Sequence, residues 1–365
     1  MAAFTAKDVQ ALREKTNVGM MDCKKALVEA DGDMDKAVDI LREKGLATAA
    51  KKASRIAAEG VIGLYSDGSA SALVELNCET DFVGNGPAFK ALANQIAKTV
   101  VEAKPADLDA LLATTISDGS VSVADAIQEL FLQIRENLKL RRFVLVEGTA
   151  VSYIHGGGSV GVLVSFDTNA DANGAEFIAM GKNIAMQVAA MNPEYLSKED
   201  ISEDELAKMK SITIDSSLNK PESLPKPILR KLFEKACGEK LFSDEDIAAY
   251  EEQKNNNFLF NFLSKEAVAT LAKLAVAGKD EYVNDKIFAG AVEGRIKKQL
   301  KEVCLLDQTF VRSDLFDGTV AGYVADVAKK LGADIKVKGF TRLAKGEGIE
   351  KKEDNFAEEV ASMMK

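Results

Sequence analysis

The sequence lacks tryptophan and contains a single histidine, His155, among its 365 residues. Its four cysteines, Cys23, Cys78, Cys237 and Cys304, lie far apart, and no two of them form a Cys-x-x-Cys pair. Structural zinc sites need clustered thiolates and imidazoles, so we expect neither a metal nor another cofactor. Scattered thiols are also typical of a protein kept in a reducing compartment.

Long apolar runs are missing as well. The first ten residues, MAAFTAKDVQ, lack the apolar core of a signal peptide, and no stretch approaches the ~20 apolar residues of a transmembrane helix. We therefore expect a cytoplasmic protein without membrane contact. The formal net charge of -10 disfavours direct binding to nucleic acid, which depends on Lys and Arg displacing counterions. A basic run formed by Arg295, Lys297, Lys298 and Lys301 is typical of a solvated helix face.

Motifs for nucleotide or catalytic chemistry are absent or misplaced. No G-x-x-x-x-G-K-[ST] motif occurs, so the chain does not resemble a GTPase. Residues 156–161 fit G-x-G-x-x-G, but they lead into an alternating strand instead of a helix N-terminus, which favours a hairpin turn. His155 has no adjacent nucleophile motif, and the carboxylates beside Cys78 disfavour its thiolate. We expect no catalytic residues.

Residues 1–54 form a first segment with helical periodicity. The pattern predicts three short helices, and in the second of them Met20, Cys23 and Leu27 fall on one stripe. We expect Gly45 to end the third helix, with a helical linker after it. A three-helix unit of this size has a thin core and usually docks on another surface.

Residues 55–140 form a first α+β half. From Glu59 the hydrophobic period changes from 3.6 to 2, which predicts two strands separated by a turn at residues 66–69. One face of the second strand is expected to carry Ala72, Val74, Leu76 and Cys78. Two helices follow, the first after Pro87 and the second capped by Ser122, with an apolar stripe that extends to Leu138.

The same order of residues returns about 88 positions later. Leu73 and Val74 align with Leu163 and Val164, and a second aligned set is Phe89, Ile96 and Ala97 with Phe177, Ile184 and Ala185. We infer a duplicated core, in which each half is a small antiparallel sheet with helices on one face. The second half is expected to span residues 141–195 and to continue in residues 286–345.

The repeat fails at one place. After its second strand the first half has Asn77-Cys78-Glu79-Thr80-Asp81-Phe82-Val83, whereas the second half has residues 167–172 without any aromatic side chain. We expect residues 80–83 to form a loop that displays a carboxylate beside a large apolar ring. The alternative, that Phe82 packs into the core, stays open on residue patterns alone.

The remaining segments are less regular. Residues 196–285 contain three of the six prolines and several helical patterns, which predict a helical protruding subdomain. A helix around residues 287–300, a helix over residues 319–331 and a strand with Ile335 and Val337 on one face follow. In residues 346–365 we expect a C-terminal module whose closing helix carries Phe356, Val360 and Met363.

Four ordered motifs resemble the bacterial elongation factor Ts family. They are residues 16–27 (TNVGMMDCKKAL), residues 77–83 (NCETDFV), residues 293–295 (EGR) and residues 346–351 (GEGIEK). The likeness covers about residues 1–195 and 286 to the end, and residues 200–285 are longer than the short hairpin usual in that family. The resemblance implies a ubiquitin-associated-like three-helix domain, a duplicated α+β core, a helical dimerisation subdomain and a C-terminal module.

The resemblance also implies a function. Family members act without catalytic residues as guanine-nucleotide exchange factors for elongation factor Tu. They bind its GDP complex and its nucleotide-free form, and GTP displaces them. By resemblance, Asp81 and Phe82 form the element that disturbs the magnesium and phosphate site, with Thr80 and Val83 shaping it. A homodimer through the helical subdomain is one assembly that the family allows.

Two rival functions come from other classes. The chain could be an adaptor that docks on unrelated proteins through its three-helix unit, which would bind a partner without accelerating nucleotide release. It could also be a thiol or acid–base enzyme centred on Cys78 and Asp81. Retained function in Cys78→Ser would exclude the thiol version.

Overall fold

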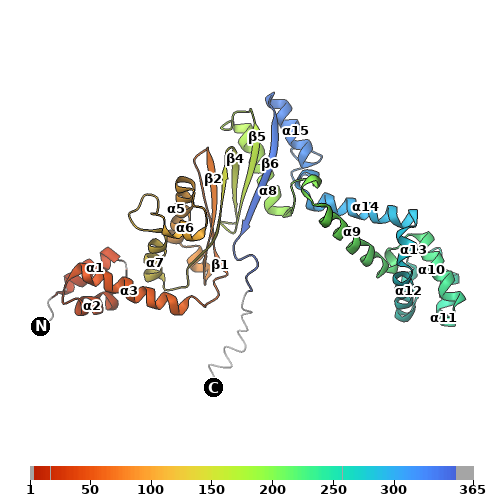
Figure 1. The fold of residues 1–365 in the computed structure, drawn as a ribbon, viewed down its shortest axis with the longest axis horizontal. Helices are drawn as coiled ribbons and strands as arrows, with labels where there is room; N and C mark the ends of the chain where they lie inside the picture. Colours follow the sequence, from red (N-terminus) through yellow and green to blue (C-terminus); the bar gives the residue numbers. More distant parts are fainter. Residues whose placement is uncertain (1–3, 17, 257, 351–365) are drawn as a thin grey trace, which may run out of the picture. The chain divides into compact units, whose positions relative to one another are not determined.

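The structure, a computed structural model, describes residues 4–16, 18–256 and 258–350. The chain forms two compact units (Figure 1). The first comprises Met1–Asn192, Val311–Phe316 and Gly322–Lys365, and the second comprises Pro193–Phe310 and Asp317–Ala321. The closing helix predicted around Phe356, Val360 and Met363 lies outside the described residues.

The first unit begins with the three predicted helices, α1 (Ala6–Thr16), α2 (Met20–Glu29) and α3 (Met34–Lys52). Cys23 and Leu27 of α2 are buried in the core of this bundle, as predicted. Met20 is 51% exposed, so its assignment to the core is wrong. The buried stripe runs from Cys23 through Ala26 to Ala30 at the end of α2, and it leaves Met20 and Met21 in solvent.

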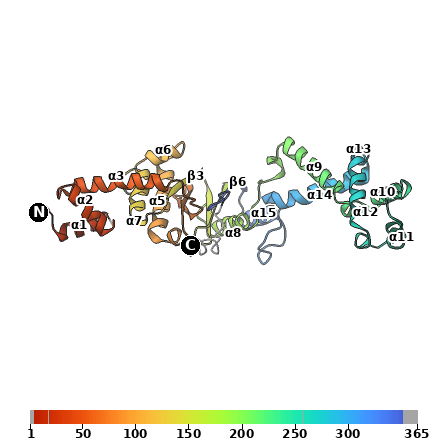
Figure 2. The same cartoon turned by 90° about the horizontal axis from the view of Figure 1, so that it is seen from below.

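Helix α3 does not end at Gly45 but runs on to Lys52. A Cβ atom at position 45 would lie 2.3 Å from Cδ2 of Leu132 on α7 (Val123–Ile134). Gly45 therefore lets α3 pass close to α7, and the predicted helix end is corrected to a close helix–helix contact. Figures 1 and 2 both show α3 reaching the side of α7.

The centre of the first unit contains two antiparallel sheets, with strand orders β1-β2-β3 and β4-β5-β6. The strands are β1 (Glu59–Ser66), β2 (Ala70–Cys78), β3 (Lys139–Glu147), β4 (Ala150–His155), β5 (Val160–Thr168) and β6 (Ile335–Ala344). Both β1-β2 and β4-β5 are hairpins. The predicted turn at residues 66–69 and the glycine-rich turn after His155 make these connections.

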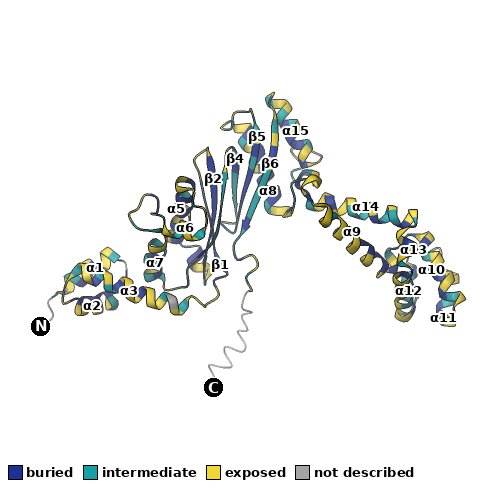
Figure 3. Ribbon diagram, in the orientation of Figure 1, coloured by how far each residue is buried: buried dark blue, intermediate teal, exposed yellow. Residues whose placement is uncertain are grey.

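The two sheets are layered between helices. Ala72, Val74, Leu76 and Cys78 share one face of β2, as predicted, and pack under α5 (Pro87–Ala103). The opposite faces of the sheets meet through Ile62, Leu73, Leu163 and Leu343. Strand β2 is buried along its whole length, whereas β4 and β6 are mostly half-buried, as the teal in Figure 3 shows. Each sheet is therefore covered by helices on one side and by the other sheet on the second side.

Helix α8 (Ala175–Met191) covers the second sheet as α5 covers the first. Both helices begin after a glycine, Gly86 or Gly174, and both end at a residue with positive φ, Lys104 (48°) or Asn192 (45°). The aligned apolar residues of the two helices are all buried. Helices α6 (Leu108–Ala113) and α15 (Val320–Leu331) complete the first unit's helical layers, α15 from Gly322 onward.

The second unit is mostly helical, as predicted. Its helices are α9 (Glu203–Leu218), α10 (Lys226–Gly238), α11 (Asp244–Gln253), α12 (Lys265–Ala277), α13 (Lys279–Val283) and α14 (Lys286–Val303). Helices α9 and α14 pack side by side, and α10–α13 share one apolar core with the adjoining parts of α9 and α14. In that core the rings of Phe233 and Tyr250 stack with centroids 4.0 Å apart.

Helix α14 belongs to this second unit, although the sequence analysis grouped residues 286–345 with the second core half. The guanidinium of Arg295 on α14 donates to the Ser217 hydroxyl of α9 and to the Ser223 carbonyl, which holds α14 on its neighbour. Lys297, Lys298 and Lys301 of the basic run are exposed, as expected of a solvated helix face.

Candidate partner-binding site

The segment singled out by the sequence, residues 80–83, lies where β2 leaves the sheet. The chain continues as α4 (Asp81–Gly84), a helix of four residues. Thr80 caps it, because its hydroxyl oxygen accepts a hydrogen bond from the Val83 N–H at 3.4 Å. The prediction of an open loop is therefore corrected to a single helical turn, for which Thr supplies a favourable N-terminal cap.

The side chains of this turn point in different directions. Val83 is buried in the core beneath α5, whereas Asp81 is exposed and Phe82 is 86% exposed. Because Val83 occupies the core position, Phe82 is left in solvent, and the alternative of a core Phe82 is wrong. A Cβ atom at Gly84 would lie 3.0 Å from the Gly60 carbonyl oxygen, so the turn lies close against β1.

The exposure of Phe82 is unusual for its size. Among the described residues it is the most exposed large apolar side chain. Complete burial of such a side chain is worth about 1.5–3 kcal/mol, a stabilisation that the isolated fold forgoes here. An aromatic ring held in solvent beside a carboxylate is suited to insertion into a partner.

A carboxylate that the sequence analysis did not select anchors the turn. Glu136 accepts hydrogen bonds from the Glu79 N–H (3.1 Å), the Thr80 N–H (3.0 Å) and the Thr80 hydroxyl (2.7 Å). The predicted helix through Leu138 would have placed Glu136 within a regular helix. Instead α7 ends at Ile134, because Arg135 adopts a left-handed conformation with φ of 62°.

Asn137 anchors the same region from its other side. Its backbone N–H donates to the Glu79 carboxylate at 2.7 Å, and its side-chain amide donates to the carbonyls of Arg55 (2.7 Å) and Ala53 (3.3 Å). The polar run 135–137 separates two apolar segments, as connectors commonly do. Nothing in its composition distinguished it from an ordinary connector.

Cys78 is buried at the end of β2, and its thiol donates to the Thr80 carbonyl at 3.1 Å. Burial, followed by the nearby carboxylates of Glu136 and Glu59, raises the pKa of Cys78 to about 12. The thiol therefore stays protonated near neutral pH, which contradicts the idea of a thiolate nucleophile. The carboxylates that raise this pKa are therefore those of Glu136 and Glu59, and not the sequence neighbours Glu79 and Asp81.

His155 lies at the exposed end of β4. Its Nδ1 is 3.0 Å from the hydroxyl of Tyr153 on the same strand. The three glycines after it all have positive φ, from 56° to 109°, as a tight connection between β4 and β5 requires. Residues 156–159 thus form the predicted hairpin turn, residues 160 and 161 begin β5, and His155 lies beside the turn.

The second half has a different structure at the equivalent place. Strand β5 ends at Thr168, whose hydroxyl donates to the Asp334 carbonyl at 2.7 Å. The Asn169 side chain accepts from the Asp334 N–H at 2.8 Å. Between Thr168 and α8 the described chain contains bends and a turn but no helix. This segment is tied to the start of β6 and displays no large apolar side chain.

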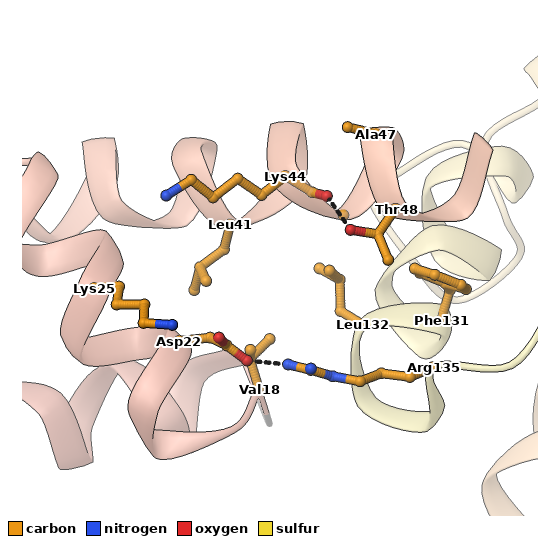
Figure 4. Close-up of a pocket in the computed structure, with 11 residues that line it drawn as sticks. Val18, Asp22, Lys25, Leu41, Lys44, Ala47, Thr48, Phe131, Leu132 and Arg135 are labelled. Carbon is orange, nitrogen blue, oxygen red and sulfur yellow. Dashed lines mark hydrogen bonds and ion pairs between the residues drawn. The ribbon is translucent and has the colours of Figure 1, made fainter. Parts of the chain in front are cut away.

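A pocket of about 410 Å³ lies elsewhere in the first unit, between the three-helix bundle and α7 (Figure 4). Leu41, Phe131 and Leu132 provide its apolar lining. Asp22 and Arg135 form an ion pair across it, which Figure 4 marks with a dashed line. The pocket follows from the contact between α3 and α7 and does not include the turn at residues 80–83.

Within the part of the chain that the structure describes, no group of three or more His, Cys, Asp or Glu side chains is arranged to hold a metal ion. None of the described helices is both long and apolar enough to cross a membrane.

Comparison with known proteins decides the family. The model of the family described as "Elongation factor TS" matches residues 79–347. The chain belongs to the elongation factor Ts family. Elongation factor Ts of Clostridioides difficile is 39% identical over 100% of both chains. The protein of the same name from Clostridium acetobutylicum is 41% identical over 99% of this chain and 98% of its own.

Membership places the chain among translation elongation factors, which serve protein biosynthesis by guanine-nucleotide exchange. The elongation factor Ts of Clostridium perfringens, 38% identical, also covers 99% of both chains. These relatives therefore span residues 196–285 too. A middle segment of similar length is thus shared with these relatives.

Proposed function

We propose that the chain is the guanine-nucleotide exchange factor for elongation factor Tu and that the turn at residues 80–83 is its exchange element. Family membership supports the choice of partner. The observation that carries the assignment to this turn is Phe82, 86% exposed beside the exposed Asp81 on an anchored helical turn. Thr80 shapes the turn as its cap, and Val83 fixes it to the core.

The chemistry of the partner explains what such a turn accomplishes. A GTPase holds GDP through backbone N–H groups of its phosphate loop and a Mg²⁺ ion that bridges protein and phosphate. In our proposal Phe82 inserts between side chains near that site, and Asp81 disturbs the magnesium neighbourhood. The affinity for GDP falls because both sets of contacts are lost.

The binding energy for this insertion comes from other surfaces. Helix α2 exposes Met20 (51%), Met21 (64%) and Val28 (55%), an apolar set suited to protein contact. We propose that the three-helix segment of residues 1–54 grips the nucleotide domain through these side chains. The second core half and the C-terminal module of residues 346–365 are proposed to contact other surfaces of the partner.

Thermodynamic reciprocity makes the factor reusable. If it weakens GDP binding about 100-fold, or roughly 2.7 kcal/mol, GDP weakens binding of the factor equally. The factor thus binds both the GDP complex and the nucleotide-free form, and incoming GTP displaces it. It forms and breaks no covalent bond, needs no cofactor and works in the cytoplasm without direct contact to nucleic acid or membrane.

The domain limits that accompany this proposal are 1–54, 55–140, 141–195 and 346–365, as the sequence predicted. For the helical subdomain we propose the wider limits of the second unit, since α14 packs on α9. We also propose that this subdomain forms a homodimer. The proposal is supported by its exposed aromatic side chains, Phe258 (70%) and Phe262 (50%).

The test is stopped-flow release of fluorescent GDP from the elongation factor Tu of the same organism, with and without this chain. Strong acceleration at substoichiometric amounts is the expected result. Binding without acceleration would contradict the proposal and favour the adaptor function instead.

A further inference from the structure

We propose that Glu136 is a positioning residue for nucleotide exchange, which holds the exchange turn of residues 80–83 in its outward conformation. Asn137 connects the start of this turn, at Glu79, to the chain that leaves the three-helix segment. The inference rests on the proposed function of the turn. Neither residue belongs to the turn or is placed against the partner. Glu136 acts through Glu79 and Thr80, and Asn137 acts through Glu79 and the chain that follows α3.

The first argument is the number of donors that converge on one carboxylate. Glu136 accepts from two consecutive backbone N–H groups, those of Glu79 and Thr80, and from the Thr80 hydroxyl, all within 2.7–3.1 Å. Hydrogen bonds to a charged acceptor are stronger than neutral ones. They fix the backbone at the position where β2 ends and α4 begins, and thereby the direction in which Asp81 and Phe82 leave the surface.

The second argument is that the turn has little else to hold it. Helix α4 has only four residues, and short isolated helices are unstable. Its own contacts with the core come from Val83, which is buried, and from Gly84, which packs on the backbone of Gly60. These contacts secure the end of the turn, while Glu136 secures its beginning.

The third argument concerns the connection to the three-helix segment. Helix α3 ends at Lys52, and the chain reaches β1 through residues whose carbonyls, at Ala53 and Arg55, accept from the Asn137 side chain. The Arg55 guanidinium in turn pairs with the Glu79 carboxylate at 3.3 Å. Glu136 and Asn137 therefore connect the exchange turn to the chain that leaves the three-helix segment. On the proposed function, they fix the position of the turn relative to the helices that bind the partner.

The test uses Glu136→Gln in the full chain, with Glu147→Gln as the matched control. Glu147 is an exposed carboxylate of the same unit that pairs with Lys104, away from the turn. Both backbone N–H groups face one oxygen of the Glu136 carboxylate, and the Thr80 hydroxyl faces the other. Glutamine keeps the size of the side chain but is neutral, so the hydrogen bonds to it lose the strength that a charged acceptor gives. In the free protein, amide hydrogen exchange at Glu79 and Thr80 should accelerate about tenfold in Glu136→Gln and remain unchanged in the control.

The functional arm separates positioning from binding. In Glu136→Gln the rate of GDP release at saturating factor should fall about tenfold, while the half-saturating concentration stays within about twofold of the wild-type value. In the Phe82→Ala background the same change should have a smaller effect, because only the contribution of Asp81 then still depends on the position of the turn. A variant that merely destabilises the fold would lower the rate by the same factor in both backgrounds.

Unchanged amide exchange at residues 79 and 80 would overturn the inference, whatever the kinetics. Unchanged GDP release with loosened amides would overturn the functional part. If the wild-type chain itself failed to accelerate release, the proposed function would fall, and the amide measurement would still decide whether Glu136 holds the turn. Should Glu136→Gln not fold, Glu136→Asp keeps the charge but shortens the side chain, and it must show the same pattern with smaller changes.

Discussion

The carboxylate of Glu75 accepts a hydrogen bond from the backbone N–H of Gly346 at 2.8 Å. Glu75 is fully buried in β2 and also pairs with Arg141 at 3.0 Å and Arg142 at 2.5 Å. Gly346 has φ of 69°, and a Cβ atom there would lie 2.1 Å from the Ala58 carbonyl oxygen. A buried carboxylate of the first sheet thus binds the chain that follows β6, and the ion pair between Lys345 and Glu59 adds a second contact.

Glu75→Gln should destabilise the fold by about 3 kcal/mol, because two arginines would lose a buried partner. Urea unfolding at neutral pH measures this change in the free energy of unfolding. Glu147→Gln, which removes an exposed carboxylate, should change the same quantity by less than about 0.5 kcal/mol. Equal stability of Glu75→Gln and wild type would show that the buried cluster contributes nothing net.

The same carboxylate gives an acid dependence. Burial alone would raise the pKa of Glu75, but the Gly346 N–H and the two arginines outweigh it and hold the pKa below its ordinary value of 4.5. The stabilisation is therefore present above pH 4.5 and is lost as the pH falls through the folded pKa. The stability difference between wild type and Glu75→Gln should shrink in urea titrations taken below that pH.

Phe82→Ala should slow GDP release from elongation factor Tu and leave the fold intact. Because the ring is 86% exposed, its removal should change the free energy of unfolding by less than about 0.5 kcal/mol. Complex formation with the nucleotide-free partner should persist, since the ring is needed to disturb the GDP site. Phe258→Ala, which removes an exposed ring from the second unit, is the matched control. Equal losses of exchange and of binding would instead make Phe82 a general binding residue.

Asp81→Asn should have a defect that depends on magnesium. If the carboxylate acts on the Mg²⁺ neighbourhood, the variant should be slow at millimolar Mg²⁺. With a chelator present it should approach the wild-type rate, because the ion is then already removed. The measurement is GDP release at saturating factor across a magnesium series, with Phe82→Ala in parallel. A defect of the same size at every magnesium concentration would rule out this role for Asp81.

Cys78→Ser should retain exchange, because the buried thiol is structural. Since burial and the nearby carboxylates raise the pKa of Cys78 to about 12, native protein at pH 8 should resist iodoacetamide at this residue and react only after unfolding. The protonated thiol stabilises the fold below its ordinary pKa of 9.0, and this contribution declines as the pH rises toward 12. Peptide mass spectrometry distinguishes Cys78 from the other cysteines. Loss of exchange in a folded Cys78→Ser would revive the enzyme hypothesis.

Local periodicity accounts for what could be predicted from the sequence. The alternation from Ala72 to Cys78 identified β2 and its buried face, and the helical stripe that begins at Phe89 identified α5. Each of these patterns depends on residues within one element. The same kind of pattern wrongly placed Met20 in the core. An apolar stripe shows which face of a helix is buried, but it does not show how far along the helix the neighbouring helices cover that face.

Contacts between distant segments account for the rest. Glu136 lies 56 residues from Thr80, and no periodic pattern links the two positions. Gly45 suggested a helix end because glycine is a poor helix former, but its role is set by Leu132 on another helix. The sequence left the direction of Phe82 open as well. In the structure its neighbour Val83 fills the core position, and the residues that surround this position come from distant segments.

The duplication of the core has a consequence for stoichiometry. Lys104 and Asn192 end two matching helices, yet only the first half turns its chain outward after the second strand, and the second half ties the same segment to Asp334. Only one of the two similar halves therefore carries an exchange turn. On the proposed function, each chain engages a single GTPase at a time, and the second half acts as a counterpart that supports the first without competing for the same partner.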